Sequence, residues 1–239
     1  MINKLILFLR SLSFMLVSII SLLIVTLTML VSYLWISERV FYRIANQWGN
    51  ISLWWLEKVC KINYQVRGLE NLPTGTAIIL SNHQSTWETL AFQLFLPPHS
   101  WVLKKELMFV PFFGWALFLL KPIAIKRENV RQALKKLIML GKQKLDAGWW
   151  LVIFPEGTRV KVNETKEFAI GGALLAAKTG YPVVPIALNS GKFWPRQKFF
   201  KYPGTIQVVI GPAIETKGKS ANEINQMAET WITETMKNL

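Results

Sequence analysis

The chain has 239 residues, enough for one domain with an anchor, and its 51% hydrophobic content concentrates in the first 60 residues, which points towards lipid. Lysine and arginine outnumber acidic residues by 28 to 14, and a net charge of +14 suits anionic lipid headgroups, nucleic acid or an acidic carrier protein. Cys60 is the only cysteine, which excludes an intramolecular disulfide, and with only two histidines a Cys/His zinc site is not expected.

An almost wholly apolar run covers residues 12–36, with no charged side chain between Ser11 and Ser37. About 20 apolar residues cross a hydrocarbon core, so this run predicts a membrane-embedded helix. It is longer than the apolar part of a signal peptide, and no small-residue cleavage site follows it. Basic residues flank it on both sides, which leaves open its orientation and whether it spans the membrane or is re-entrant.

A second helix is indicated by apolar residues at helical spacing, namely Ile44, Trp48, Ile51, Trp55 and Val59. Its tryptophans suit either a helix at the level of the lipid headgroups or one that covers the following domain. We therefore expect two parts, a membrane-anchoring helical segment over residues 1–60 and a globular domain over residues 61–239.

Strands and helices alternate in the remainder of the chain. Short apolar or alternating runs predict strands over residues 63–68, 76–80, 149–154, 183–188 and 205–210. Helical patterns cover residues 86–96, 129–144, 171–179 and 221–237. The apolar residues 108–120 suit a buried helix or the wall of an apolar channel. This order predicts an α/β domain with a mostly parallel sheet flanked by helices.

The predicted strand at residues 76–80 leads into Asn82, His83 and, five residues further on, Glu88. If a helix starts near residue 86, this carboxylate can hold one imidazole nitrogen and leave the other free as a base. The pattern Ser85-x-x-Glu88 is also a capping box, in which Glu88 satisfies the start of the helix. The motif alone leaves both roles of Glu88 open.

The predicted strand at residues 149–154 ends in a second motif, Phe154-Pro-Glu-Gly-Thr-Arg159. Gly157 permits close approach of the backbone to a ligand, Thr158 offers hydrogen-bond donors, and Arg159 offers a planar fork for phosphate. A turn with a solvated arginine would have the same residues, so this motif by itself is also ambiguous.

Three further motifs follow the same order and make the chain similar to a known family. The full set is Asn82-His83-x4-Glu88, Lys104-x-Glu106-Leu107, Ile123-Ala-Ile-Lys-Arg127, Phe154-Pro-Glu-Gly-Thr-Arg159 and Val184-Pro-Ile186. Over residues 72–186 they resemble the glycerolipid acyltransferase family of the bacterial 1-acylglycerol-3-phosphate acyltransferases. The resemblance implies a glycerol-3-phosphate acyltransferase-like α/β fold. It also implies transfer of an acyl chain from acyl-CoA or acyl carrier protein to the sn-2 hydroxyl of lysophosphatidic acid, forming phosphatidic acid.

The resemblance also implies roles for individual residues. His83 would be the general base with Glu88 as its partner, and the phosphate site would consist of Arg159, Gly157, Thr158, Lys104, Lys105 and Arg127. Asn82, Glu156 and Pro185 would have structural roles, and neither a cofactor nor a metal is implied. The expected partners are membrane lipids, the lysophospholipid acceptor and the acyl donor. Since both donors are cytosolic, the catalytic domain is expected to face the cytoplasm at a bacterial inner membrane.

Glu88 departs from the family pattern, which usually has aspartate at this position. Other functions therefore stay open, namely acylation of another lysophospholipid or acylated lipid, or membrane binding without turnover. Nucleic-acid binding is disfavoured because no motif of that kind accompanies the positive charge. Aromatic and basic residues interleave over residues 192–201, which favours an interfacial loop there.

Overall fold

A single mixed sheet forms the centre of the protein in the computed structural model, which describes residues 3–126 and 128–239. Within these residues the strand order is β1-β7-β6-β2-β5-β3-β4. The strands are β1 (Ile62–Arg67), β2 (Ile78–Ser81), β3 (His99–Lys104), β4 (Ile123–Ile125), β5 (Trp150–Ile153), β6 (Val183–Leu188) and β7 (Gly204–Ile210). All neighbouring strands run parallel except β6 and β7. The predicted mostly parallel α/β fold is therefore confirmed.

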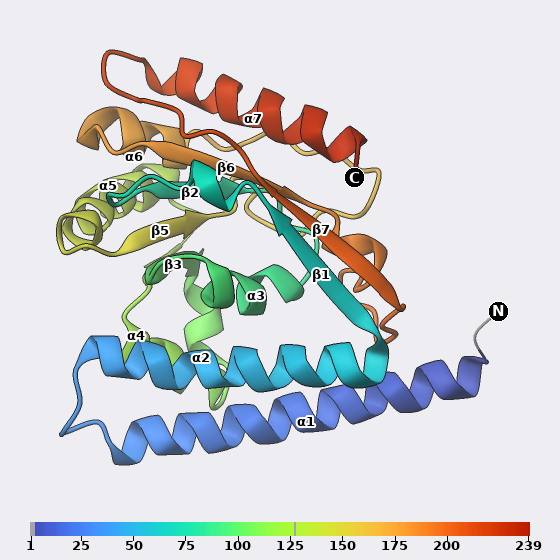
Figure 1. Cartoon of the computed structure of the whole chain (residues 1–239). Helices are drawn as coiled ribbons and strands as arrows, with labels where there is room; N and C mark the ends of the chain where they lie inside the picture. Colours follow the sequence, from blue (N-terminus) through green and yellow to red (C-terminus); the bar gives the residue numbers. More distant parts are fainter. Residues whose placement is uncertain (1–2, 127) are drawn as a thin grey trace.

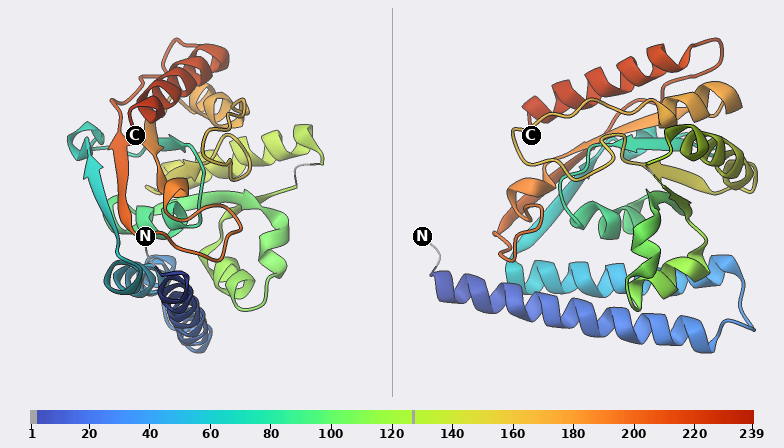
Figure 2. Two further views of the ribbon diagram at one scale, coloured as in Figure 1. Left: turned by 90° about the vertical axis from the view of Figure 1, so that its right-hand side faces the viewer. Right: turned by 180° about the vertical axis from the view of Figure 1, so that it is seen from behind.

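Helices cover both faces of this sheet (Figure 1). They are α1 (Lys4–Val31), α2 (Glu38–Trp55), α3 (Trp87–Phe95), α4 (Phe113–Leu120), α5 (Val130–Asp146), α6 (Gly171–Thr179) and α7 (Ala221–Lys237). Short helical turns are η1 (Leu56–Cys60), η2 (Leu69–Asn71), η3 (Lys105–Phe109) and η4 (Ser190–Lys192). Seen from the side and from behind, α1 and α2 form the layer farthest from α7 (Figure 2).

The strands place alternate side chains in two separate cores, as the two-residue period of a strand requires. In β2, Ile79 belongs to a core that α2 and α3 cover, whereas Ile78 and Leu80 belong to a core covered by α5, α6 and α7. All three side chains are fully buried. β2 is therefore apolar on both faces, as expected of a central parallel strand.

The helices α1 and α2 form an antiparallel pair that packs against the sheet domain (Figure 1). Phe14 of α1 and Leu53 of α2 belong to the same core as Ile79 and the inward residues of β6 and β7. Among the described residues, α1 is the helix that is long and apolar enough to cross a membrane. The expected anchoring segment and the expected domain thus share one hydrophobic core.

Serines on α1 form hydrogen bonds with α2 and with the sheet domain. The indole of Trp48 donates to the carbonyl of Ser18 at 2.9 Å, and the indole of Trp55 donates to the hydroxyl of Ser13 at 3.1 Å. Ser11 is fully buried, and its hydroxyl accepts the backbone N–H of Lys201 at 3.0 Å. These bonds fix the rotation of α1 about its own axis.

The predicted second helix is confirmed as α2, and its most buried residues lie beside the predicted stripe, of which Ile44, Trp48 and Trp55 also pack against the cores. Phe41, Tyr42, Ala45 and Leu53 are buried, whereas the tryptophans are only half-buried or, at Trp54, 55% exposed. The strands β3 and β4 were not predicted. Both lie at one edge of the sheet, where β3 pairs with β5 and β4 pairs with β3.

Candidate active site

A buried carboxylate holds the imidazole of His83 just beyond the carboxyl end of β2. The Nδ1 atom of His83 lies 2.8 Å from Oε1 of Glu88, whose side chain is fully buried. The same oxygen accepts the backbone N–H groups of Gln84 and Ser85, each at 2.7 Å. The other oxygen, Oε2, accepts the hydroxyl of Ser190 at 2.8 Å. Glu88 thus caps the start of α3 and holds His83 at the same time.

This contact determines which imidazole nitrogen is basic. A carboxylate only accepts hydrogen bonds, so Nδ1 of His83 carries a proton and Nε2 has the free lone pair. The ring of Phe154 stacks on the imidazole, with centroids 4.0 Å apart and planes within 10°. The side chain of His83 keeps 16% of its surface exposed, and it lines a cavity. His83 is therefore both fixed in orientation and accessible.

The second motif holds the backbone of His83 from the neighbouring strand β5. Glu156 Oε2 accepts the N–H of His83 at 2.7 Å, and the N–H of Val160 donates to the carbonyl of His83 at 2.7 Å. Burial raises the pKa of Glu156 to about 8. A carboxylic acid still accepts a hydrogen bond through its carbonyl oxygen, so this contact does not require a charge.

Arg159 lies beside the histidine, beyond a sharp turn at Gly157. Gly157 has a φ of 68°, in the left-handed region that glycine adopts without strain. The guanidinium of Arg159 donates through Nη1 to the hydroxyl of Thr86 at 2.7 Å, and Arg196 donates to the Arg159 carbonyl at 2.6 Å. Burial lowers the pKa of Arg159, but a guanidinium keeps its proton in proteins. The site thus holds a fixed positive charge near His83.

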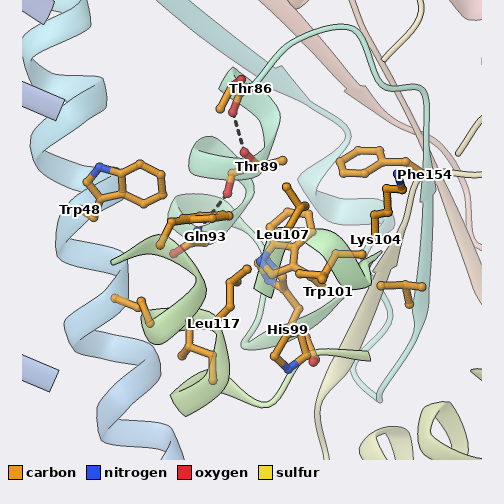
Figure 3. A pocket seen from close by; sticks show the side chains of 18 of the residues that line it. Trp48, Thr86, Thr89, Gln93, His99, Trp101, Lys104, Leu107, Leu117 and Phe154 are labelled. Atoms are coloured by element: carbon orange, nitrogen blue, oxygen red, sulfur yellow. Dashed lines mark hydrogen bonds between the residues drawn. The ribbon is translucent and has the colours of Figure 1, made fainter. Parts of the chain in front are cut away.

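One cavity of about 400 Å³ brings these residues together with an apolar region. Its polar lining includes His83, Thr86, Lys104, Gly157, Thr158 and Arg159. Its apolar lining comes from α1, α2, α4 and β3 and includes Leu22, Val25, Ala45, Trp48, Trp101, Phe113 and Leu117. Figure 3 shows Thr86 and Lys104 towards one end of the cavity and His99 and Leu117 towards the other. The volume lies in the 300–1,000 Å³ range of small-molecule sites.

Comparisons with known proteins identify the family. A model of the acyltransferase family matches residues 63–189. A 1-acyl-sn-glycerol-3-phosphate acyltransferase of Pseudomonas aeruginosa is 51% identical over 202 residues, which cover 83% of this chain and 79% of that protein. The chain belongs to the acyltransferase family. A protein of the same name from Helicobacter pylori is 32% identical to this acyltransferase, over 64% of this chain and 68% of that protein.

Longer relatives and a solved structure extend the comparison. The chloroplastic 1-acyl-sn-glycerol-3-phosphate acyltransferase BAT2 of Brassica napus is 31% identical, and the match spans 57% of its length. The crystal structure of the 1-acyl-sn-glycerophosphate acyltransferase PlsC from Thermotoga maritima superposes with a TM-score of 0.84. That match covers 99% of this chain and 97% of the other at 22% identity, and it establishes a common fold.

The structure gathers most of the predicted site residues of this acyltransferase around the cavity. His83, Gly157, Thr158, Arg159 and Lys104 line it. Lys105 begins η3 and is exposed, outside the cavity lining. Arg127 lies outside the described residues.

Asn82 and Pro185, for which structural roles are expected, join neighbouring strands of the sheet. The side-chain amide of Asn82 donates to the carbonyl of Leu188 at 2.8 Å and accepts the Leu188 N–H at 2.9 Å. These two bonds join the carboxyl end of β2 to that of β6. Pro185 lies in β6 opposite Leu80, and its carbonyl accepts the N–H of Gly211 at 2.8 Å.

Sequence patterns missed the contacts that Thr86 and Ser190 make with the predicted residues. Ser190 follows β6, a strand adjacent to β2, so the convergence of parallel strands at one edge was the available signal. Burial raises the pKa of the Cys60 thiol to about 11, which makes a nucleophilic thiolate unfavourable. In residues 3–126 and 128–239, no group of three or more His, Cys, Asp or Glu side chains is placed to hold a metal ion.

Proposed function

We propose that this acyltransferase moves a fatty acyl chain from a thioester donor to the sn-2 hydroxyl of lysophosphatidic acid, forming phosphatidic acid. The observation that carries the proposal is the single cavity that joins His83 and Arg159 to an apolar region. An enzyme that acylates an acylated glycerophosphate needs three features, namely a base, a residue that binds the phosphate and an apolar wall for the acyl chain. The names of the Pseudomonas aeruginosa and Helicobacter pylori relatives support the same acceptor.

The chemistry follows from the tautomer of His83. Its Nδ1 donates a hydrogen bond to Glu88, so Nε2 removes the proton of the acceptor hydroxyl as that oxygen attacks the thioester carbonyl. The C–S bond of the resulting tetrahedral intermediate then breaks, and the leaving thiolate takes the proton back from Nε2. The ester and the free thiol are the products. Glu88 stabilises the imidazolium between the two proton transfers.

We assign the phosphate of the acceptor to Arg159, with Gly157, Thr158 and Lys104 as further ligands. The hydrogen bond from Arg159 Nη1 to Thr86 fixes the plane of the guanidinium, and the remaining N–H groups can donate to phosphate in a bidentate manner. The side chain of Lys104 is half exposed at the same cavity, and its ammonium group lies 3.7 Å from the carboxylate of Glu106. Lys105 and Arg127 stay proposed ligands on the basis of the family resemblance.

We further propose that residues 1–60 anchor the protein in a bacterial inner membrane, with residues 61–239 on the cytoplasmic side. The length and apolar character of α1 support membrane association. Acyl-CoA and acyl carrier protein are both candidate donors, and both are cytosolic. No cofactor is required for the reaction as proposed.

An acyl-transfer assay with the purified full-length protein in detergent tests this function. Lysophosphatidic acid is offered with acyl-CoA or with acylated carrier protein, and other lysophospholipids and monoacylglycerol serve as competing acceptors. We expect phosphatidic acid as the main product, with His83→Ala lowering kcat by about 10²–10⁴. Preference for a different lysophospholipid would reassign the acceptor. If neither donor supports transfer to any acceptor, the proposed reaction is wrong.

A further inference from the structure

The segment from residue 107 to residue 120 is apolar on all sides. It contains no charged side chain, and it forms the end of η3 and the helix α4. A helix that is apolar all round is normally covered by protein or by lipid.

The inner side of α4 is covered by the rest of the protein. Phe113 and Leu117 line the cavity of the candidate active site. Ala116 and Leu119 pack in a small core with Met29 and other residues of α1 and α2. These contacts account for one side of the helix.

The outer side of the same segment has no cover in the described chain. Phe109 is 75% exposed, Phe118 is 67% exposed and Trp115 is 46% exposed. Exposed apolar patches of this kind mark contact sites for a partner or for a membrane.

Continuity with α1 identifies the partner as lipid. The hydroxyl of Thr26 in α1 donates to the carbonyl of Phe112 at 3.4 Å, so the start of α4 lies against α1. The exposed apolar side chains of α1 near this point are Ile20, Ile24 and Leu27, each about half exposed. Lys105 and Lys121 flank the apolar segment and are exposed, which suits anionic headgroups, whereas Lys104 pairs with Glu106 at 3.7 Å.

We propose that α4 and η3 form a second membrane-inserted element, with Phe109, Trp115 and Phe118 in the same leaflet as the exposed side of α1. The proposal rests on the membrane association of α1 proposed above. Because the opposite side of α4 lines the active-site cavity, one helix separates that cavity from the lipid. The acceptor can then enter from the bilayer without crossing water.

Single-cysteine labelling tests the insertion without any activity measurement. Cys60 is replaced by alanine, and a polarity-sensitive fluorophore is attached to Phe109→Cys or Phe118→Cys in the full-length protein. Leu27→Cys in α1 is the membrane control, and Val130→Cys, at a 65% exposed position of α5, is the aqueous control. The labelled proteins are reconstituted in vesicles of phosphatidylethanolamine and phosphatidylglycerol, with and without lipids that carry a quencher on the acyl chain.

We expect the probes at positions 109 and 118 to be quenched to within about twofold of the probe at position 27. Quenching no greater than that at position 130 overturns the insertion of α4. If position 27 is also unquenched, the membrane association of α1 fails as well, which separates the two proposals. Shielding that depends on protein concentration and not on the quencher lipids would assign this face to a second copy of the chain.

A separate observation concerns Ser190, which lies outside every motif recognised in the sequence. Ser190 is fully buried directly beyond β6, and its hydroxyl donates to Oε2 of Glu88 at 2.8 Å. Next to it, the N–H of Gly191 donates to the side-chain oxygen of Gln84 at 3.1 Å. The two segments that follow β2 and β6 are therefore joined directly at the His83–Glu88 pair.

We infer that Ser190 is a positioning residue for the catalytic base, acting through Glu88. The two carboxylate oxygens have different partners. Oε1 accepts hydrogen bonds from His83 and from two backbone N–H groups, whereas Oε2 accepts one from the hydroxyl of Ser190. A buried carboxylate is costly unless its oxygens are hydrogen-bonded. The longer side chain of glutamate, compared with aspartate, allows one carboxylate to reach both His83 and Ser190.

Ser190→Ala removes this donor, and Ser81→Ala is the matched control. Ser81 is also fully buried at the end of β2, and its hydroxyl donates only to the carbonyl of Asn82. A hydrogen bond to a charged group predicts a decrease of about 10- to 100-fold in kcat for Ser190→Ala, with the KM for lysophosphatidic acid unchanged. Loss of the donor makes the carboxylate more basic, so the acidic limb of the kcat–pH profile should move to higher pH.

Two outcomes would overturn this inference. The first is an unchanged pH profile in Ser190→Ala, and the second is an equal loss of kcat in Ser81→Ala. A cycle with Glu88→Asp gives an independent measurement, because the shorter carboxylate cannot keep both contacts. In that background Ser190→Ala should lower kcat by less than about threefold, and a full additive loss would contradict the link between the two residues.

Discussion

Replacing Glu88 with glutamine removes the charge beside His83 and leaves the size of the side chain almost unchanged. The amide oxygen can still accept the three N–H groups that contact Oε1, and the amide nitrogen can donate to the hydroxyl of Ser190. The tautomer of His83 and the cap of α3 are thereby retained. What is lost is the stabilisation of the imidazolium during the reaction.

The size of the effect follows from the 2.8 Å contact between Nδ1 and Oε1. With an effective dielectric constant of about 20, two unit charges at that distance attract by about 6 kcal/mol, which is an upper bound for the loss. The neutral amide still accepts the same hydrogen bond and recovers part of it. We therefore expect kcat to fall by about 10²–10⁴, the range of general-base catalysis, with little change in KM.

Initial rates with lysophosphatidic acid, measured between pH 5 and pH 9, give kcat and KM for the variant. Thermal unfolding in the same detergent gives its stability. If Glu88 served only as a helix cap, Glu88→Gln would change the melting temperature by a few degrees at most and leave kcat within about threefold of the wild type. That result would refute the proposed role of the carboxylate.

Three further predictions concern the second motif. Arg159→Ala and Arg159→Lys should both raise the KM for lysophosphatidic acid about 10- to 100-fold, because lysine lacks the planar fork, and they should leave monoacylglycerol use unchanged. An unaltered KM in either variant would remove Arg159 from the phosphate site. Burial raises the pKa of Glu156 to about 8, above the roughly 4.3 of an unfolded glutamate, so the folded state prefers the proton. The contribution of Glu156 to folding stability is complete below the pKa of the unfolded state and is lost as pH rises through 8. The melting temperature of Glu156→Gln should therefore rise relative to that of the wild type between pH 5 and pH 8. An equal difference at both pH values would disprove this. Gly157→Ala forces a side chain into a φ of 68° and should cost about 1–2 kcal/mol in unfolding free energy, whereas Gly75→Ala, with open space around the added carbon, should be neutral.

The helices and strands could be predicted wherever the sequence has a clear hydrophobic periodicity and residues that begin or end an element. The helices α6 and α7 and the strand β6 have the predicted bounds, because Gly180 ends α6 and Ser220 with Glu223 caps α7. β3 and β4 were missed for a physical reason. β3 has no alternation of apolar and polar residues, and β4 has only three residues, so their strand structure depends on pairing with β5 and with each other.

The candidate site was predictable only in part, because its contacts are partly local and partly distant. His83 and Glu88 are five residues apart, and a local pattern suggested their pairing. Ser190 contacts Glu88 from 102 positions away, and Arg159 contacts Thr86 from 73 positions away. Only the order of the strands brings these pairs together. No pattern within one segment can show this order.

Residues from both predicted parts, 1–60 and 61–239, line the cavity. Leu22 and Val25 of α1, with Ala45 and Trp48 of α2, line the same cavity as His83. The helical pair therefore supplies one side of the space proposed for the acyl chain. This placement explains why α1 carries serines that bond to α2 and to the domain, since a helix that only had to cross lipid would not need a fixed rotation. The proposed membrane anchor and the proposed substrate site consequently share the walls of one cavity.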